Sequence, residues 1–245
     1  MGPSWGLNSF DAHILFFLNQ FAGQSRILDA FVVTVANADL LKGATIMAPL
    51  LWIWFRQSQN RARDRELVIL SLFLSPASVL VARAFALSLP FRERPLRVPA
   101  LHFQIPYTMN PQGLEGWSSF PSDHAAMFFA AATCLFFISQ RLGILALLYS
   151  FLVICLPRVY LGLHYPTDII AGALIGTGTG FWVKVPRVRT AVASPFLRWE
   201  QLHPSQFYPL FFIVTFEVSE LFGSLRGIGR FGFMATKALA ARLFR

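Results

Sequence analysis

Three short polar groups in this sequence combine the residue types that bind and transform anions. They occupy residues 92–95 (Arg-Glu-Arg-Pro), residues 118–124 (Ser-Ser-Phe-Pro-Ser-Asp-His) and residues 158–168, where the spacing is Arg-x5-His-x3-Asp. Planar arginine side chains match phosphate oxygens, and a histidine beside a carboxylate is suited to nucleophilic or proton-transfer chemistry. Two histidines, an aspartate, a serine and at least two arginines around one point predict a phosphate-processing site.

Each group taken alone also has a structural explanation. Arginines at helix ends commonly reach to lipid headgroups, and a Ser122-Asp123 start is an ordinary helix cap. A single interfacial histidine is more often structural than catalytic. The combination favours the site, because ionisable residues at membrane depth are functional candidates by default.

The residue types suggest a division of roles. A helix that begins at Ser122 offers free N–H groups to a phosphate, and the arginines supply charge, so that no divalent metal and no cofactor is required. His164 precedes a helix whose first turn contains Asp168, so the carboxylate can bond one imidazole nitrogen and leave the other as nucleophile. His124 can then protonate the leaving oxygen.

Composition decides which fold can present these groups. Of 245 residues, 55% are hydrophobic and 13% charged, whereas a soluble domain carries roughly a quarter charged residues. The sequence therefore predicts an all-α, polytopic membrane helix bundle of about six transmembrane helices plus interfacial helices. The net charge of +9 is expected in cytoplasmic loops, and no nucleic-acid partner is expected.

The chain divides into three parts by hydropathy. Residues 1–40 predict an interfacial helix and a weak first span, and residues 41–186 the transmembrane core. Residues 187–245 form a basic C-terminal appendage with an amphipathic or seventh helix. Glu217 and Glu220 favour the interfacial alternative for that helix.

The predicted core contains five apolar runs, at residues 41–55, 67–89, 125–139, 142–156 and 169–183. The arginine-rich residues 56–65 assign one end of the bundle to the cytoplasm. Alternation then places all three polar groups on the opposite face, the periplasmic face of a bacterial-type inner membrane. Gly172, Gly176 and Gly180 recur every fourth residue and predict a helix-packing face.

The motifs resemble the three ordered signatures of the type 2 phosphatidic acid phosphatase superfamily, the membrane lipid phosphate phosphatases. They are Arg94-Pro95, Pro121-Ser122-Asp123-His124 and Arg158-x5-His164-x3-Asp168. The resemblance implies a phosphohistidine mechanism, in which His164 attacks, Asp168 orients it and His124 is the acid. It also implies that Arg94, Arg158 and Ser122 hold the phosphoryl group.

Three positions depart from the family's pattern. Leu87 stands where the family has a lysine, and Arg83 or Arg92 is expected to replace it in phosphate binding. Asp123, in the predicted phosphate site, replaces a common glycine, as in bacterial undecaprenyl-diphosphate phosphatases. This carboxylate would repel a phosphate unless it were protonated, paired with an arginine or turned outward. Pro157 replaces a serine and is expected to end one helix.

The leading hypothesis is an integral membrane phosphatase that hydrolyses a lipid phosphate or diphosphate, with undecaprenyl diphosphate as the first choice. Phosphatidylglycerol phosphate, phosphatidate and lipid A phosphates are alternative substrates. A membrane serine hydrolase with Ser122 as nucleophile and a non-catalytic lipid or anion transporter are alternatives of other classes. The oligomeric state stays open.

Overall fold

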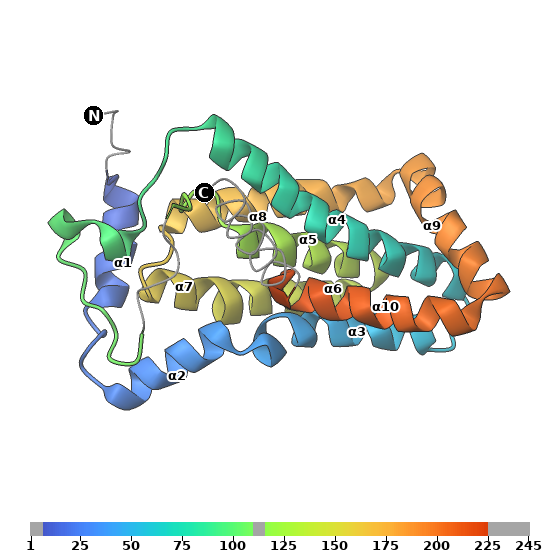
Figure 1. The fold of residues 1–245 in the computed structure, drawn as a ribbon, viewed down its shortest axis with the longest axis horizontal. Coiled ribbons are helices and arrows are strands. Elements are labelled where there is room, and N and C mark those ends of the chain that lie inside the picture. The colour runs from blue at the N-terminus through green and yellow to red at the C-terminus, as the bar shows by residue number, and fades with distance from the viewer. Residues whose placement is uncertain (1–6, 110–115, 225–245) are drawn as a thin grey trace, which may run out of the picture.

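A computed structural model describes residues 7–109 and 116–224, and this part of the chain consists of helices and connecting loops without a strand. The basic tail after residue 224 lies outside the described residues. The α-helices are α1 (Ser9–Asn19), α2 (Arg26–Asn37), α3 (Thr45–Phe55), α4 (Arg61–Ser88), α5 (Asp123–Ile138), α6 (Gln140–Tyr149), α7 (Leu156–Tyr160), α8 (Pro166–Gly180), α9 (Pro186–Leu202) and α10 (Pro204–Ser219). The all-α helical bundle is thus confirmed (Figure 1).

Short helical turns connect several of these helices. Two are π-helical, η1 (Leu40–Ala44) before α3 and η4 (Ser150–Cys155) between α6 and α7. The 3-10 turns are η2 (Pro95–Arg97), η3 (Pro99–Leu101) and η5 (Phe181–Lys184).

Within the described residues, two helices are long and apolar enough to cross a membrane, namely α4 and the continuous helix Gln140–Tyr160. Two bent pairs pass the same criterion only when each is taken as one span: α2 with Leu40–Phe55, bent by 65°, and Pro166–Lys184 with α9, bent by 80°. This gives two to four candidate spans, while α5 is a shorter apolar helix.

The N-terminal segments differ from the expected arrangement in one respect. Helix α1 crosses the end of the bundle (Figure 1), and its interfacial position stays a prediction. The predicted weak first span and the predicted span at 41–55 are instead the two halves of one bent candidate span. The reason is length, because the 11 residues of α3 rise only about 16 Å, against a hydrocarbon core of about 30 Å.

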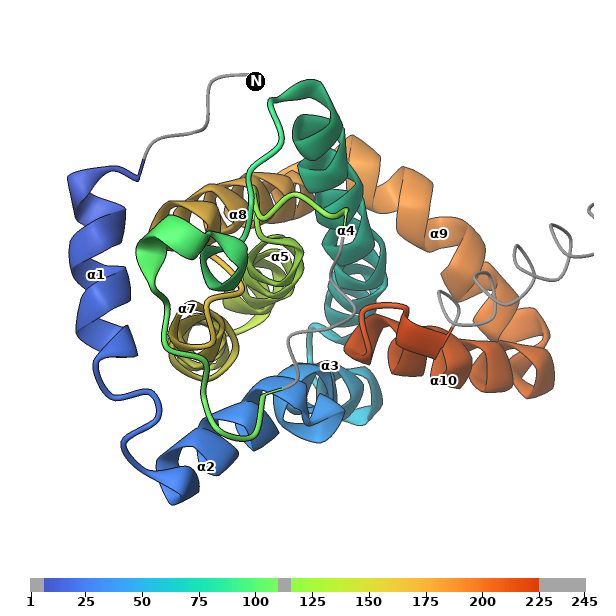
Figure 2. The ribbon, with the colours of Figure 1, turned by 60° about the vertical axis from the view of Figure 1, so that its left-hand side comes forward.

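Helix α5 lies at the centre of the bundle and packs on α8 and α4 (Figure 2). The α5–α8 contact depends on the glycine stripe. A Cβ built on Gly172 would overlap the Ser122 carbonyl oxygen, one on Gly176 that of Ala126, and one on Gly180 would lie 2.7 Å from Cβ of Thr133. The predicted packing face is therefore confirmed, and it fixes the start of α5 against the start of α8.

Ion pairs join the basic segments that were assigned to the cytoplasm. Nη1 of Arg65 lies 3.1 Å from Oε1 of Glu200, and Nε of Arg189 lies 2.7 Å from Oε2 of Glu66. These pairs bring α9 to the N-terminal end of α4. Because the 28 residues of α4 rise about 40 Å, its C-terminal end and the polar groups beyond it lie at the opposite end of the bundle.

Residues 187–224, the described part of the predicted appendage, pack into the bundle rather than standing apart from it. The ring of Trp54 in α3 lies 5.6 Å from that of Phe207 and 4.7 Å from that of Phe211, both in α10 (centroid distances). Helix α10 runs alongside α3 (Figure 1), and its outward side chains include Phe212 and Ile213. Helix α10 has 16 residues and is not among the candidate spans, so the choice between an interfacial helix and a seventh span stays a prediction. The contact could not be anticipated because hydropathy does not show which aromatic side chains meet.

Candidate active site

The three polar groups meet at the end of the bundle opposite the arginine-rich segment. Each pair of groups is joined by a hydrogen bond that involves the main chain: Ser119 N to Arg92 O (2.9 Å), Ser122 N to Asp168 O (3.1 Å) and Arg94 Nη1 to Leu163 O (2.7 Å). The convergence expected from the sequence is therefore present in the fold.

His164 is buried in the loop between α7 and α8, and its ring is held by a main-chain group. Its Nδ1 lies 2.8 Å from the carbonyl oxygen of Ser119 and 3.6 Å from Oδ2 of Asp168. Because a carbonyl oxygen only accepts, the neutral ring carries its proton on Nδ1 and keeps a lone pair on Nε2. Ser119, rather than Asp168, is the nearest partner. Sequence reasoning missed it because main-chain acceptors carry no residue signature.

The surroundings of His164 favour its neutral form. Burial lowers the pKa of His164, and the charges of Arg94 and Arg158 lower it further, whereas Asp168 acts in the opposite direction. Burial also lowers the pKa of Arg94, although an arginine remains cationic at neutral pH. A neutral imidazole between two cations is the form that a nucleophilic histidine requires.

Asp168 is fully buried in the first turn of α8, with both of its oxygens bonded. Oδ2 accepts from the main-chain N–H of Tyr165 (2.8 Å), which caps the helix, and Oδ1 accepts from Nη1 of Arg92 (2.5 Å). Arg92 is further paired with Asp11 in α1, at 2.7 Å. Arg92 is thus engaged by two carboxylates, and this geometry does not favour its predicted role as a substitute for the missing lysine.

Arg83, the other candidate substitute, pairs with Asp123. Its Nε lies 2.7 Å from Oδ1 of Asp123, and its Nη2 donates to the Pro121 carbonyl oxygen (3.1 Å). Of the three ways in which a carboxylate could be tolerated beside a phosphate, the structure shows pairing with an arginine. Arg83 thereby compensates Asp123, and less of its charge is available to a substrate.

Arg94 and Arg158 are the cations of the site that have no carboxylate partner among the described residues. Both are buried, and the Nε atom of each has no hydrogen-bond partner within residues 7–109 and 116–224. Nη2 of Arg158 lies 3.5 Å from the carbonyl oxygen of Ala36. Each lowers the pKa of the nearby His164. Two buried, uncompensated guanidinium groups beside a neutral histidine favour an anion as ligand.

The prediction that Pro157 ends a helix just before Arg158 is wrong. The helix does not end at this proline but continues from α6 through η4 into α7. The π-helical turn changes the hydrogen-bond register just before Pro157, which has no N–H to contribute, so the proline is accommodated at the start of α7. The helix ends instead before Gly162, whose φ of 65° suits glycine.

Ser122 and His124 lie at the start of α5. Ser122 is fully buried and is the N-cap, with Oγ accepting from Ala125 N at 3.4 Å. His124 is the second residue of the helix, half-buried, with its ring 6.3 Å from that of Phe128. The predicted helix start is confirmed, whereas the phosphate contact of Ser122 and the acid role of His124 stay predictions. No group of three or more potential metal ligands occurs among His, Cys, Asp and Glu side chains of the described chain.

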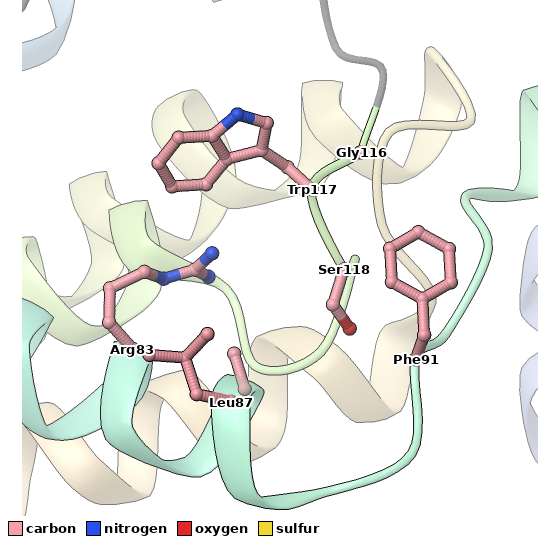
Figure 3. A pocket seen from close by; sticks show the side chains of 7 residues that line it. Arg83, Leu87, Phe91, Gly116, Trp117 and Ser118 are labelled. Carbon is pink, nitrogen blue, oxygen red and sulfur yellow. The ribbon is translucent and has the colours of Figure 1, made fainter.

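A pocket of about 320 Å³ lies beside the Arg83–Asp123 pair (Figure 3). Its walls are mostly apolar, and its lining residues are Arg83, Ala86, Leu87, Phe91, Gly116, Trp117 and Ser118. The guanidinium carbon of Arg83 lies 5.6 Å from the centre of the Trp117 ring. Leu87, at the position of the family's lysine, is 88% exposed. Leucine in place of the family's lysine therefore makes this wall of the pocket apolar.

Comparison with known proteins finds bacterial relatives of this chain. The bacitracin transport permease protein BcrC of Bacillus licheniformis is 39% identical over 27% of this chain and 32% of its own length. The lipid A 4'-phosphatase of Bacteroides thetaiotaomicron is 29% identical, over 72% of this chain and 76% of its own. The undecaprenyl-diphosphatase BcrC of Bacillus subtilis is 25% identical, over 64% and 74%.

A solved structure and a family model are also similar to this chain. The crystal structure of Aquifex aeolicus LpxE superposes with a TM-score of 0.51 at 25% identity, and the match covers 74% of this chain and 98% of that one. The model of the PAP2 superfamily matches residues 88–189, which contain all three polar groups. The expected resemblance to phosphatases of the PAP2 superfamily is thereby confirmed.

Proposed function

We propose that the protein hydrolyses a lipid phosphate or diphosphate through a phosphohistidine intermediate on His164. The observation that carries this proposal is the position of His164. Its Nδ1 faces the Ser119 carbonyl at 2.8 Å, which leaves Nε2 unprotonated, and it lies beside the uncompensated Arg94 and Arg158. The arrangement supplies a nucleophile and an anion-binding pair at one point.

The reaction then follows in two balanced steps. Nε2 of His164 attacks the phosphorus, the bond to the leaving oxygen breaks, and His124 gives that oxygen a proton. Water next attacks the phosphorus, the P–N bond breaks, and the proton released by the water returns to His124. Arg94 and Arg158 hold the phosphoryl oxygens in both steps.

The apolar pocket supports a lipid as the substrate. Leu87 and Phe91 are exposed near the end of α4, a candidate span, and they line the same pocket as Arg83 (Figure 3). A hydrocarbon chain could extend from the bilayer over these side chains while the phosphate enters the site. Undecaprenyl diphosphate remains our first choice, with lipid A phosphates, phosphatidate and phosphatidylglycerol phosphate as alternatives.

The location follows from the two ends of the bundle. Because the arginine-rich end is expected in the cytoplasm, the site opens on the external face, and we assign the protein to a bacterial-type inner membrane. The serine hydrolase alternative finds less support. Ser122 is fully buried and its Oγ caps α5, so it is poorly placed to attack a substrate.

Phosphate release from the candidate lipids in detergent with EDTA present tests this proposal, with His164→Ala and Ser122→Ala beside the unchanged protein. We expect turnover that vanadate inhibits, an acid-labile phosphoprotein, loss of both in His164→Ala, and residual turnover in Ser122→Ala. Turnover by His164→Ala would refute the phosphohistidine step. Loss of turnover in EDTA would show that a metal takes part. A protein that binds vanadate without releasing phosphate would favour the transporter alternative.

A further inference from the structure

A buried ion network lies behind the reacting face of His164. The guanidinium group of Arg92 bridges two fully buried carboxylates, with Nη2 2.7 Å from Oδ2 of Asp11 and Nη1 2.5 Å from Oδ1 of Asp168. The other oxygen of Asp168 lies 3.6 Å from Nδ1 of His164. A chain of contacts therefore connects α1, through Arg92 and Asp168, to the proposed nucleophile.

Asp11 is fixed to the first turn of α8 by its own hydrogen bonds. The main-chain N–H of Thr167 donates to Oδ1 of Asp11 (2.8 Å), and the Thr167 hydroxyl donates to Oδ2 (2.7 Å). Nη1 of Arg92 also donates to that hydroxyl (2.8 Å), and Asn8 donates to Asp11 Oδ2 (2.9 Å). Each of the two oxygens of the Asp11 carboxylate thus accepts at least one hydrogen bond.

Two further contacts hold Arg92 in place. Its guanidinium carbon lies 3.9 Å from the centre of the Tyr165 ring, and its main-chain N–H donates to Oγ of Ser118 (3.2 Å). A planar group held between two carboxylates and an aromatic ring has little freedom to move. The orientation of Asp168 is set by the same contacts.

We infer that Asp11 and Arg92 are positioning residues for the reaction, because they hold Asp168 against His164. This inference rests on the proposed phosphohistidine function. Burying two carboxylates and an arginine carries a desolvation penalty, and apolar packing would join α1 to α8 without it. The network is explained if the oriented charge of Asp168 is needed beside the imidazole, since small displacements of catalytic groups reduce rates strongly.

The charges around His164 make it possible to distinguish a positioning role of the network from a purely structural role. They are Asp168 with Arg92 and Asp11 behind it, and Arg94 and Arg158 on the substrate side. Asp11→Asn removes a negative charge and leaves the charge of Arg92 less compensated. A protonated His164 is then less favourable, so the acid limb of kcat/KM moves to lower pH.

Arg92→Lys keeps the charge, but a single ammonium cannot hold both carboxylates as the guanidinium does. We therefore expect kcat to fall about tenfold or more, with KM little changed. Thr167→Val, which removes the hydroxyl shared by Asp11 and Arg92, is a milder variant. It is expected to lower kcat in the same way, and it serves as the test if Asp11→Asn does not fold.

Asp29→Asn provides the matched control. Asp29, in α2, is also fully buried and accepts three hydrogen bonds, from Gly23 N, Tyr107 N and Tyr160 Oη, but it contacts no residue of the network. We expect Asp11→Asn and Asp29→Asn to lower Tm alike, and only Asp11→Asn to shift the acid limb and reduce kcat.

The experiment measures kcat, KM and Tm from pH 4 to 9 on the full chain in detergent, with His164→Ala included. If Asp11→Asn, Arg92→Lys and Asp29→Asn all keep the unchanged kcat and acid limb while His164→Ala is inactive, the positioning role is overturned and the proposed function stands. An active His164→Ala protein would instead overturn the proposed function.

Discussion

The carboxylate of Asp123, the first residue of α5, lies 2.7 Å from Nε of Arg83, which lines the apolar pocket. This pair shows how an acidic residue is accommodated where the family signature commonly has glycine. Its negative charge is compensated by the guanidinium group of Arg83. The same arginine donates to the Pro121 carbonyl and so holds the segment that leads into α5.

Removing the partner of Asp123 should weaken substrate binding. In Arg83→Gln the carboxylate is no longer compensated and repels an anionic lipid, so we expect KM to rise about tenfold, equivalent to about 1.4 kcal/mol. In Arg83→Gln with Asp123→Asn the repelling charge is absent, and KM should recover. A double-mutant cycle on KM measures this coupling.

Arg56→Gln is the matched control for that cycle. Arg56 forms an equivalent 2.7 Å pair with Asp64, but at the arginine-rich end of the bundle. Its loss should leave KM unchanged. Strictly additive effects of the Arg83 and Asp123 changes would show that the two side chains do not interact functionally.

Arg158→Lys should reduce activity steeply, although the charge is kept. Lysine cannot supply two parallel donors to phosphoryl oxygens, and loss of a charged hydrogen bond of about 1.5–3 kcal/mol corresponds to a decrease of about 10- to 100-fold in kcat/KM. Arg141→Lys, at the exposed start of α6, is the control and should behave as the unchanged protein. If the two variants were equally active, Arg158 would be only a structural residue.

The rate should depend on pH with a bell-shaped profile. His164 attacks only when neutral, and burial lowers its pKa, so protonation inactivates it at a lower pH than for an ordinary histidine. The acid limb of kcat/KM is therefore expected below about 6.5. The basic limb reports loss of the proton that His124 must donate. An acid limb above 6.5, or a rate that only rises with pH, would contradict this assignment of the two histidines.

The location of the site could be predicted from the sequence because its residue types are rare in apolar surroundings. Arg94, His164 and Asp168 stand out against their neighbours, and helix start signals at Ser122 and Pro166 place them at one end of the bundle. Such signals are local. They carry over into the fold because a helix cap and a membrane boundary are decided within a few residues.

The partners of these residues could not be predicted in the same way. Arg92 was expected at the phosphate but binds Asp11, 81 positions away, and His164 is held by a main-chain carbonyl. Pro157 was expected to end a helix that a π-helical turn carries past it. Long-range pairing and changes of helical register are set by tertiary packing, which one sequence does not display.

The glycine stripe of α8 offers a test of stability that also reaches the active site. A Cβ at Gly176 would overlap the carbonyl oxygen of Ala126 in α5, whereas a Cβ at Gly178, in the same helix, would meet no atom within 4 Å. Gly176→Ala should therefore force α5 and α8 apart and lower the free energy of unfolding by about 1–3 kcal/mol. Gly178→Ala should leave it unchanged or raise it by up to about 1 kcal/mol, since alanine favours the helix.

Activity distinguishes close packing from a general effect of alanine in this helix. Ala126 lies one turn after Ser122, whose main-chain N–H bonds the Asp168 carbonyl, so separation of the helices displaces the two halves of the site. We expect Gly176→Ala to lose activity at temperatures where it is still folded, and Gly178→Ala to keep it. Denaturant titration in detergent and phosphate release on the same samples give both quantities. Equal stability and equal activity of the two variants would mean that the α5–α8 contact tolerates a methyl group and does not set the geometry of the site.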